Sequence, residues 1–130
     1  MIKSESIMLR SNYQNLIVWQ KAMSLTTNVY NLVKKLPKEE LFALSDQMRR
    51  AVVSIPSNIA EGCGRQSCNQ LSYFFNVAKG SAMELETQLL ICQNLGYLTE
   101  NDTGDSMSLL EEIVKMLNSL GKNKKLSSAN

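Results

Sequence analysis

The chemistry open to this chain of 130 residues is limited first by its lack of histidine. Without histidine there can be no Ser-His or Cys-His catalytic pair and no histidine metal site. Carboxylates alone could still bind a hard cation through oxygen. We favour the interpretation that they pair with basic side chains across helices, as charged groups do at interfaces. The carboxylates concerned are Glu61, Glu84 and Glu86, and their potential partners are Arg49, Arg50 and Lys79.

The other candidates for catalysis are serines, cysteines and a glycine cluster. The serines in the middle of the chain have no base beside them in sequence, which a serine nucleophile requires. The cluster from Gly62 to Arg65 follows a helix and lacks the Lys-Ser/Thr that completes a phosphate-binding loop. Cys63, Cys68 and Cys92 are odd in number and have no Cys-x-x-Cys spacing, which indicates reduced thiols. We therefore predict a protein that is not an enzyme, with no catalytic residue, metal or cofactor.

Basic residues raise a second possibility, which is phosphate binding. The chain has 14 basic and 12 acidic residues, a formal net charge of +2 that is weak for a nucleic-acid-binding module. Arg49 and Arg50 point to different faces of one helix. Arg50 could pair with Asp46 at i, i+4 and with Glu61, or with Glu84, and so hold a helix interface together. Alternatively, arginines repeated by symmetry around an oligomer would form a basic surface that contacts phosphates.

Four amphipathic helices are predicted to position these residues, because apolar side chains recur at i, i+3, i+4 and i+7. The first helix ends at Pro37. The second follows Lys38, contains Pro56, where we expect a kink, and is broken by Gly62 and Gly64. The predicted core stripes are Trp19, Ala22, Met23, Thr26, Val29, Tyr30, Val33 and Leu36 in the first helix, and Leu41, Leu44, Met48, Val52, Ile55 and Ile59 in the second.

The third helix is expected from about residue 67 to 94, closed by Gly96. Thr99 and Asp102 resemble a capping box that opens the fourth helix, and Gly121 stops it. No strand pattern competes, and the short connections make neighbouring helices antiparallel. The prediction is an all-α, up-down antiparallel four-helix bundle at residues 13–121, with mobile segments at 1–12 and 122–130.

The third helix is unusual because both of its sides are apolar or small. One side carries the expected core stripe, and a helix of this kind is buried on both sides. In so small a bundle, the second partner is most economically another subunit. Short side chains also line the far side of the second helix. The predicted oligomer interface comprises Arg50, Ser54, Ser57, Tyr73, Gly80, Met83, Glu84, Thr87, Leu90 and Ile91.

Three runs of sequence together resemble a known family. They are YQNLIVWQKAM at residues 13–23, QMRRAVVSIPSNIAEGCGR at 47–65 and SAMELETQLLICQNLGYL at 81–98. They are similar to the bacterial four-helix bundle family named for intervening sequences in 23S ribosomal RNA genes, also labelled S23 ribosomal protein. The resemblance extends from about Tyr13 to Leu120. The SIPSNIAEG run, with a proline inside a helix, is its most specific part.

The resemblance implies an up-down four-helix bundle that assembles as a homopentameric ring with a central pore. The biochemical role of the family is largely undefined. A related accessory protein of diversity-generating retroelements has the same barrel, is strongly basic and is associated with nucleic acid. Its basic run matches this chain at Arg49, Arg50 and Arg65, although this chain is nearly charge-balanced.

The sequence as a whole favours a cytoplasmic, non-enzymatic homo-oligomer. No stretch approaches the ~18 apolar residues of a membrane span, so no membrane partner is expected. The leading hypothesis is weak binding of RNA or DNA, without strong sequence preference, through a basic ring surface that includes Arg49, Arg50 and Arg65. The alternative is a protein-interaction scaffold or accessory subunit without nucleic-acid binding, in which the arginines hold the interfaces together.

Overall fold

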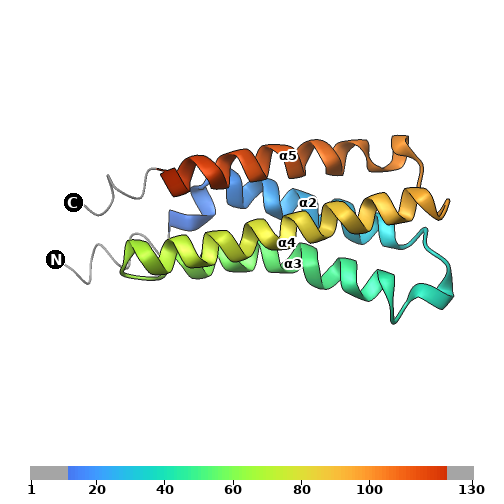
Figure 1. The fold of residues 1–130 in the computed structure, drawn as a ribbon, viewed down its shortest axis with the longest axis horizontal. Coiled ribbons are helices and arrows are strands. Elements are labelled where there is room, and N and C mark those ends of the chain that lie inside the picture. The colour runs from blue at the N-terminus through green and yellow to red at the C-terminus, as the bar shows by residue number, and fades with distance from the viewer. Residues whose placement is uncertain (1–11, 123–130) are drawn as a thin grey trace.

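The computed structural model describes residues 12–122, and within that range the chain forms helices joined by short connections, without a strand (Figure 1). Four long α-helices follow one another, and two short 3₁₀ turns precede the first and second of them. Lys122 ends the last helix, so this helix continues through Gly121 instead of stopping there. The rest of the segments predicted to be mobile lies outside the described residues. The elements are η1 (Tyr13–Asn15), α2 (Ile17–Val33), η2 (Lys38–Glu40), α3 (Leu44–Cys63), α4 (Cys68–Asn94) and α5 (Glu100–Lys122).

The four long helices alternate in direction and lie side by side along the long axis of the molecule (Figure 1). Each helix packs against its neighbours in the chain, and α5 also packs against α2, which closes the bundle. The diagonal pairs, α2 with α4 and α3 with α5, make no close backbone approach. The all-α arrangement of four antiparallel helices predicted from the sequence is therefore confirmed.

The buried stripe of α2 is rotated relative to the predicted one. Met23 and Tyr30 are exposed, although both were expected in the core. Leu41 is also exposed, because it lies in the turn before α3 and not inside the helix. Trp19 is half-buried and makes an edge-to-face contact with Tyr13, with ring centroids 5.4 Å apart. The residues of α2 that are buried are Val18, Ala22, Leu25, Val29, Leu32 and Val33.

Pro56 lies buried inside α3, and the helix continues past it to Cys63. A proline has no N–H, so the carbonyl of Val52 loses its usual helical partner. The hydroxyl of Thr26 on α2, which donates to the carbonyl of Ala22 at 2.8 Å, approaches the Val52 carbonyl to 3.5 Å. The carbonyl that Pro56 leaves without its helical donor is therefore buried against a polar group of the neighbouring helix.

The connection between α4 and α5 is fixed by two local motifs. Gly96 has a φ of +78°, and the N–H groups of Gly96 and Tyr97 donate to the carbonyls of Gln93 and Cys92. This is the hydrogen-bond pattern of a Schellman cap, in which glycine avoids the strain of the left-handed conformation. The predicted closure of the third helix by Gly96 is thus confirmed.

The predicted capping box at the start of α5 is also present. The N–H of Thr99 donates to Asp102 at 2.9 Å, and the N–H of Asp102 donates to the Thr99 hydroxyl at 3.0 Å. Lys35, in the connection that follows α2, contacts the other carboxylate oxygen of Asp102 at 2.8 Å. Asp102 thus joins the α2–α3 connection to the α4–α5 connection at the same end of the bundle. The Lys35 ammonium and the Thr99 N–H lower the pKa of Asp102 to about 2.

Gly62 does not break α3, contrary to the expectation. It is helical and buried, and a Cβ at this position would lie 3.1 Å from the ring of Phe75 and 3.2 Å from the carbonyl oxygen of Leu71. The absence of a side chain therefore allows α3 and α4 to approach closely where the two helices meet.

Gly62→Ala should destabilise the protein by about 1–3 kcal/mol, because an added methyl group in a filled space forces the Phe75 ring or the α4 backbone to move. Gly104→Ala is the matched control. Gly104 is helical with nothing within 4 Å of its Cβ position, so this change should stabilise by about 0.5–1 kcal/mol. Chemical denaturation measures the free energy of unfolding of both variants. Equal stability of the two variants would contradict the close packing.

Asp102→Asn should lower the thermal unfolding midpoint at neutral pH and by much less near pH 2. The pKa of Asp102 is lower in the folded chain than its ordinary value of about 4. The carboxylate therefore stabilises the fold above pH 4, and this stabilisation is lost as the pH falls through about 2. Asp105→Asn, at an exposed carboxylate of the same helix, is the control. A midpoint difference as large at pH 2 as at neutral pH would show that ionisation of Asp102 is not its source.

Candidate functional site

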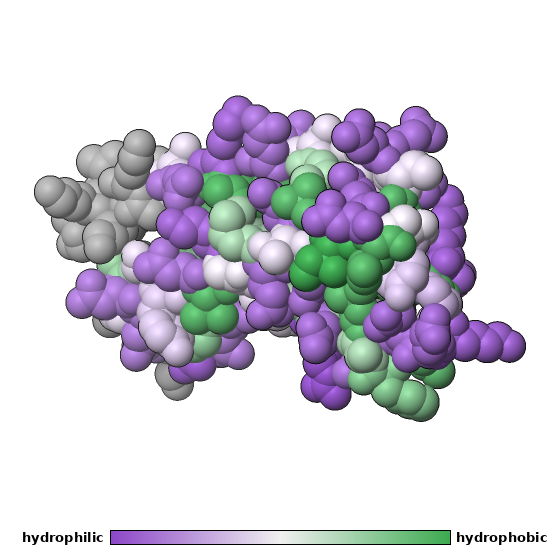
Figure 2. All heavy atoms as spheres, turned by 45° about the vertical axis from the view of Figure 1, so that its right-hand side comes forward, coloured by the Kyte–Doolittle hydropathy of each residue, from purple (hydrophilic) through white to green (hydrophobic). Residues whose placement is uncertain are grey.

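The outer side of α4 is apolar and exposed in the single chain. Tyr73 exposes 62% of its surface, and Met83, Leu90 and Ile91 expose 42%, 42% and 40%. Gly80 lies between them with open space around its Cβ position. Figure 2 shows apolar side chains gathered toward the end of the molecule that carries the α2–α3 and α4–α5 connections. The sequence placed these residues opposite the core stripe of their helix, and the structure places them there.

These residues are spread along the outer side of α4, with the exposed polar residues Asn76, Glu84 and Thr87 between them. Met83 lines a hollow between α4 and α5, together with Met107 and Val114. Ile91 lines a different groove, between α3 and α4. The exposed apolar surface therefore reaches both neighbouring helices.

The polar residues predicted at this interface are used partly within the chain. Ser54 on α3 and Ser81 on α4 share a hydrogen bond of 2.8 Å. The side-chain amide of Asn58 donates to the carbonyl of Ser54 at 2.7 Å and to its hydroxyl at 2.9 Å. Ser54 is therefore a link between α3 and α4 of the same chain, whereas Ser57 is exposed.

A groove of about 450 Å³ runs between α3 and α4. It lies beyond the Ser54–Ser81 contact, toward the start of α3 and the end of α4. Gln88 is only 5% exposed at this groove. Its amide oxygen, Oε1, is buried without a hydrogen-bond partner. Sequence reasoning missed Gln88, although its place one turn from Leu85 on the core side of the helix was a usable signal. The residues that line the groove are Gln47, Arg50, Glu84, Thr87, Gln88 and Ile91.

Two of the three predicted nucleic-acid-binding arginines lie together near the start of α3. The Arg50 side chain is 79% exposed, and its Nε donates to Asp46 at 2.9 Å. Asp46 raises the pKa of Arg50 through this hydrogen bond. Arg49 is more buried and donates to the carbonyl of Leu41 at 3.2 Å, with Asp46 4.0 Å away. The predicted Arg50–Asp46 pair is confirmed, but no ion pair joins Arg50 to Glu61 or Glu84.

Arg65 lies at the other end of α3. It pairs with Glu61 at 2.8 Å, and its guanidinium lies 4.8 Å from the centroid of the Phe74 ring. Arg65 lies two residues past the end of α3, and the helix from Arg50 to Cys63 alone is about 20 Å long. One chain therefore does not bring the three arginines into one cluster.

Residues 12–122 contain no group of three acidic or cysteine side chains arranged to hold a metal ion. Cys63 and Cys92 are buried, and Cys68 is half-buried. Burial raises the pKa of Cys63, and burial together with the charge of Glu40 raises that of Cys92 to about 11. These two thiols are therefore protonated at neutral pH and poorly nucleophilic.

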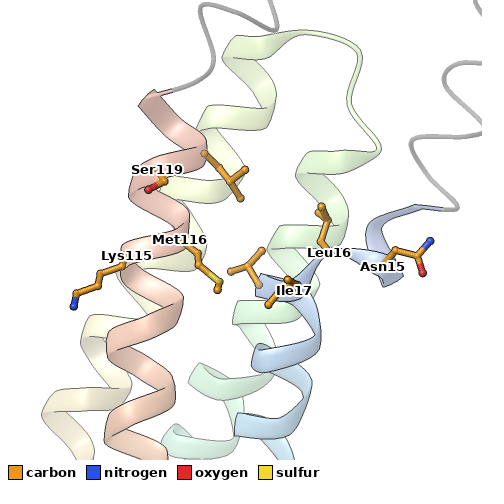
Figure 3. A pocket seen from close by; sticks show the side chains of 8 residues that line it. Asn15, Leu16, Ile17, Lys115, Met116 and Ser119 are labelled. Carbon is orange, nitrogen blue, oxygen red and sulfur yellow. The ribbon is translucent and has the colours of Figure 1, made fainter.

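A second hollow, of about 490 Å³, lies between the start of α2 and the end of α5 (Figure 3). Its wall is mainly apolar, with Leu16 and Ile17 on one side and Met116 on the other, and Lys115 points outward. Sequence reasoning placed no functional residue here. None of the described helices has the length and apolar character that a membrane crossing requires.

Comparison with known proteins identifies relatives of this chain. Residues 14–119 match the 23S rRNA-intervening sequence protein family. The fold is similar to a crystal structure of a protein with unknown function from the S23 ribosomal protein family of Bacteroides thetaiotaomicron VPI-5482. The TM-score is 0.76, the sequences are 29% identical, and the match covers 82% of this chain and 99% of the other. None of the curated proteins matches the chain. The chain belongs to the 23S rRNA-intervening sequence protein family.

Proposed function

We propose that this protein is a non-enzymatic homo-oligomer that assembles through the outer side of α3 and α4, and that the assembly binds RNA or DNA phosphates without reading bases. The exposed apolar surface of α4 is the observation that carries the proposal. The assembly we propose is the pentameric ring implied by the family resemblance, in the cytoplasm.

The outer sides of α4 and α5 differ in a way that supports this proposal. The described part of α5 exposes no large hydrophobic residue. It carries charged pairs instead, between Lys115 and Glu111 and between Lys21 of α2 and Glu112. A charged outer side is typical of a helix that faces water, whereas contiguous exposed apolar residues mark interaction surfaces. The contrast supports α4 as the contact helix.

Weak pairing of the arginines supports phosphate binding. The pair between Arg50 and Asp46 is exposed, and exposed ion pairs stabilise by only about 0–1 kcal/mol. A phosphate, which accepts charge-assisted hydrogen bonds from a guanidinium, can therefore compete with Asp46. An oligomer repeats Arg49 and Arg50 around its axis, so several weak contacts add along one strand.

One observation favours the alternative, a protein-interaction scaffold without nucleic-acid binding. Arg49, Arg50 and Arg65 each have a carboxylate of the same chain within 4.0 Å. In the scaffold, these pairs stiffen α3 and contribute no free positive charge.

Replacement of Arg49, Arg50 and Arg65 by glutamine should distinguish the two functions. Nuclease-treated wild-type protein should bind short labelled RNA or DNA with an affinity that falls steeply between about 50 and 200 mM salt. The triple variant should bind at least tenfold more weakly and with a shallower salt dependence. Lys115→Gln, which removes one exposed charge on α5, is the control. Absence of binding by the wild type at 50 mM salt would exclude the nucleic-acid hypothesis and leave the scaffold.

Gly80→Leu should break the assembly without harming the single chain. The space around the Cβ position of Gly80 is open, so a leucine fits the monomer but obstructs a partner. Sedimentation analysis should show a multimer for the wild type and a monomer for the variant. Gly104→Leu, at an equally open glycine on α5, should remain multimeric. Retention of the wild-type mass by Gly80→Leu would show that this side of α4 is not the interface.

A further inference from the structure

A hollow at the α2–α3 connection brings three basic side chains together. It has a volume of about 230 Å³ and lies between the end of α2 and the first turns of α3. Its apolar lining includes the buried Val33 and the exposed Leu41. Lys34, Lys38 and Arg49 line it as well, and none of the lining residues is acidic. A small apolar hollow is therefore bordered by three positive charges.

The two lysines of this hollow differ from the other lysines whose side chains the structure describes. Three lysines elsewhere each contact a carboxylate at 3.2 Å or less, and Lys79 donates to Asn118 at 3.1 Å. Within residues 12–122, Lys34 and Lys38 form neither an ion pair nor a side-chain hydrogen bond. Both of these uncompensated charges border the same hollow, where an anion can meet them together.

Phe42 lies beside this hollow, in the same connection. It exposes 91% of its surface, whereas every other large apolar side chain of the described residues exposes 62% or less. It directly follows Leu41, which lines the hollow, and consecutive Cα atoms are only about 3.8 Å apart. A ring so fully in water contributes nothing to the core of the single chain. Its place next to unpaired cations points to contact with a ligand.

The combination of free cations and an exposed ring defines the chemistry of that ligand. A phosphate accepts charge-assisted hydrogen bonds from ammonium and guanidinium groups. Arg49 directs one nitrogen to the carbonyl of Leu41, and its guanidinium has further N–H groups. An aromatic ring stacks on a nucleobase without regard to which base it is. A nucleotide carries both groups, a phosphate and a base, on one sugar.

Stacking on Phe42 requires a base with an open face. In a duplex each base is covered by its neighbours, whereas the bases of a single strand can turn out and stack on a protein ring. We infer that the α2–α3 connection binds single-stranded nucleic acid, with one phosphate held by Lys34, Lys38 and Arg49 and one base stacked on Phe42. This inference rests on the proposed function and names its substrate class. Each connection takes one phosphate and one base, so tight binding of a strand still needs the repeats that assembly provides.

Phe42→Ala tests the stacking contact. Labelled single strands should bind to the variant about fivefold or more weakly, since one stacked base is lost, while a fully paired duplex of the same length should bind as it does to the wild type. The salt dependence should not change, because the ring carries no charge. Leu95→Ala is the matched control. Leu95 is 55% exposed at the end of α4 and does not line the hollow, so this change should alter neither affinity.

Lys34→Gln combined with Lys38→Gln tests the phosphate contact. The double variant should bind single strands more weakly and with a shallower fall in affinity between about 50 and 200 mM salt. Lys79→Gln combined with Lys115→Gln is its control, because it removes the same number of charges from α4 and α5, away from the hollow. All four lysines lie outside the core, so thermal unfolding should show that each double variant is folded.

Phe42→Trp reports the contact directly. Made together with Trp19→Phe, it places the one tryptophan of the chain beside the hollow. Tryptophan also stacks on bases, so this variant should keep the affinity of the wild type for a single strand. Its fluorescence should be quenched as the strand binds, and a duplex should quench it much less.

The outcomes separate this inference from the proposed function. A wild type that binds no nucleic acid at 50 mM salt overturns both. Binding that the triple arginine variant weakens, but that Phe42→Ala leaves unchanged, overturns the inference alone. So does equal affinity of the wild type for strand and duplex, or a tryptophan at position 42 whose emission the strand leaves unchanged. If Phe42→Ala instead abolishes binding to vesicles of phosphatidylcholine and phosphatidylserine and spares the strand, the connection is a membrane contact and the inference is wrong. Selective loss of single-strand affinity in Phe42→Ala supports it.

Discussion

The contact between α3 and α4 is the constraint on which the rest of the structure depends. At one end Gly62 lets Phe75 pack directly against the α3 backbone, and near the middle Ser54 and Ser81 share a hydrogen bond. These contacts hold the two helices close where they meet. Toward the other end they leave the groove that contains Gln88. The same pair of helices is therefore tightly packed at one end and separated by a groove at the other.

This arrangement explains why α4 has two apolar sides. Its inner side fills the core, with Ala78, Ala82, Leu85 and Leu89 buried. Its outer side cannot turn inward, because the bundle is already closed by the packing of α5 against α2. Exposed apolar surface of this kind favours association, since its removal from water is the main driving force for subunits to bind. The folded single chain thus leaves part of the apolar surface of α4 exposed to solvent.

Local sequence signals predicted the helices, the Gly96 cap and the capping box, because each of them depends on residues close in sequence. Features that depend on tertiary distance were not predictable. Tyr30 fits the helical period but lies at the edge of the buried stripe, and Gly62 resembles a helix breaker until Phe75 is known to contact it. The burial of Gln88 could be expected from its place one turn from Leu85, but its unpartnered oxygen could not, since that exists only because α3 and α4 meet around it.

The positions of the arginines lead to a conclusion about assembly. Arg50 lies in the first half of α3 and Arg65 just beyond its last residue, and each is bonded to a carboxylate four residues earlier in the chain. Such local pairs form in a single helix and require no partner, so they do not themselves indicate a phosphate site. A basic surface built from these arginines can arise only if subunits align the same end of α3 around an axis. The proposed binding of nucleic acid therefore requires the proposed assembly, whereas that assembly does not require nucleic acid.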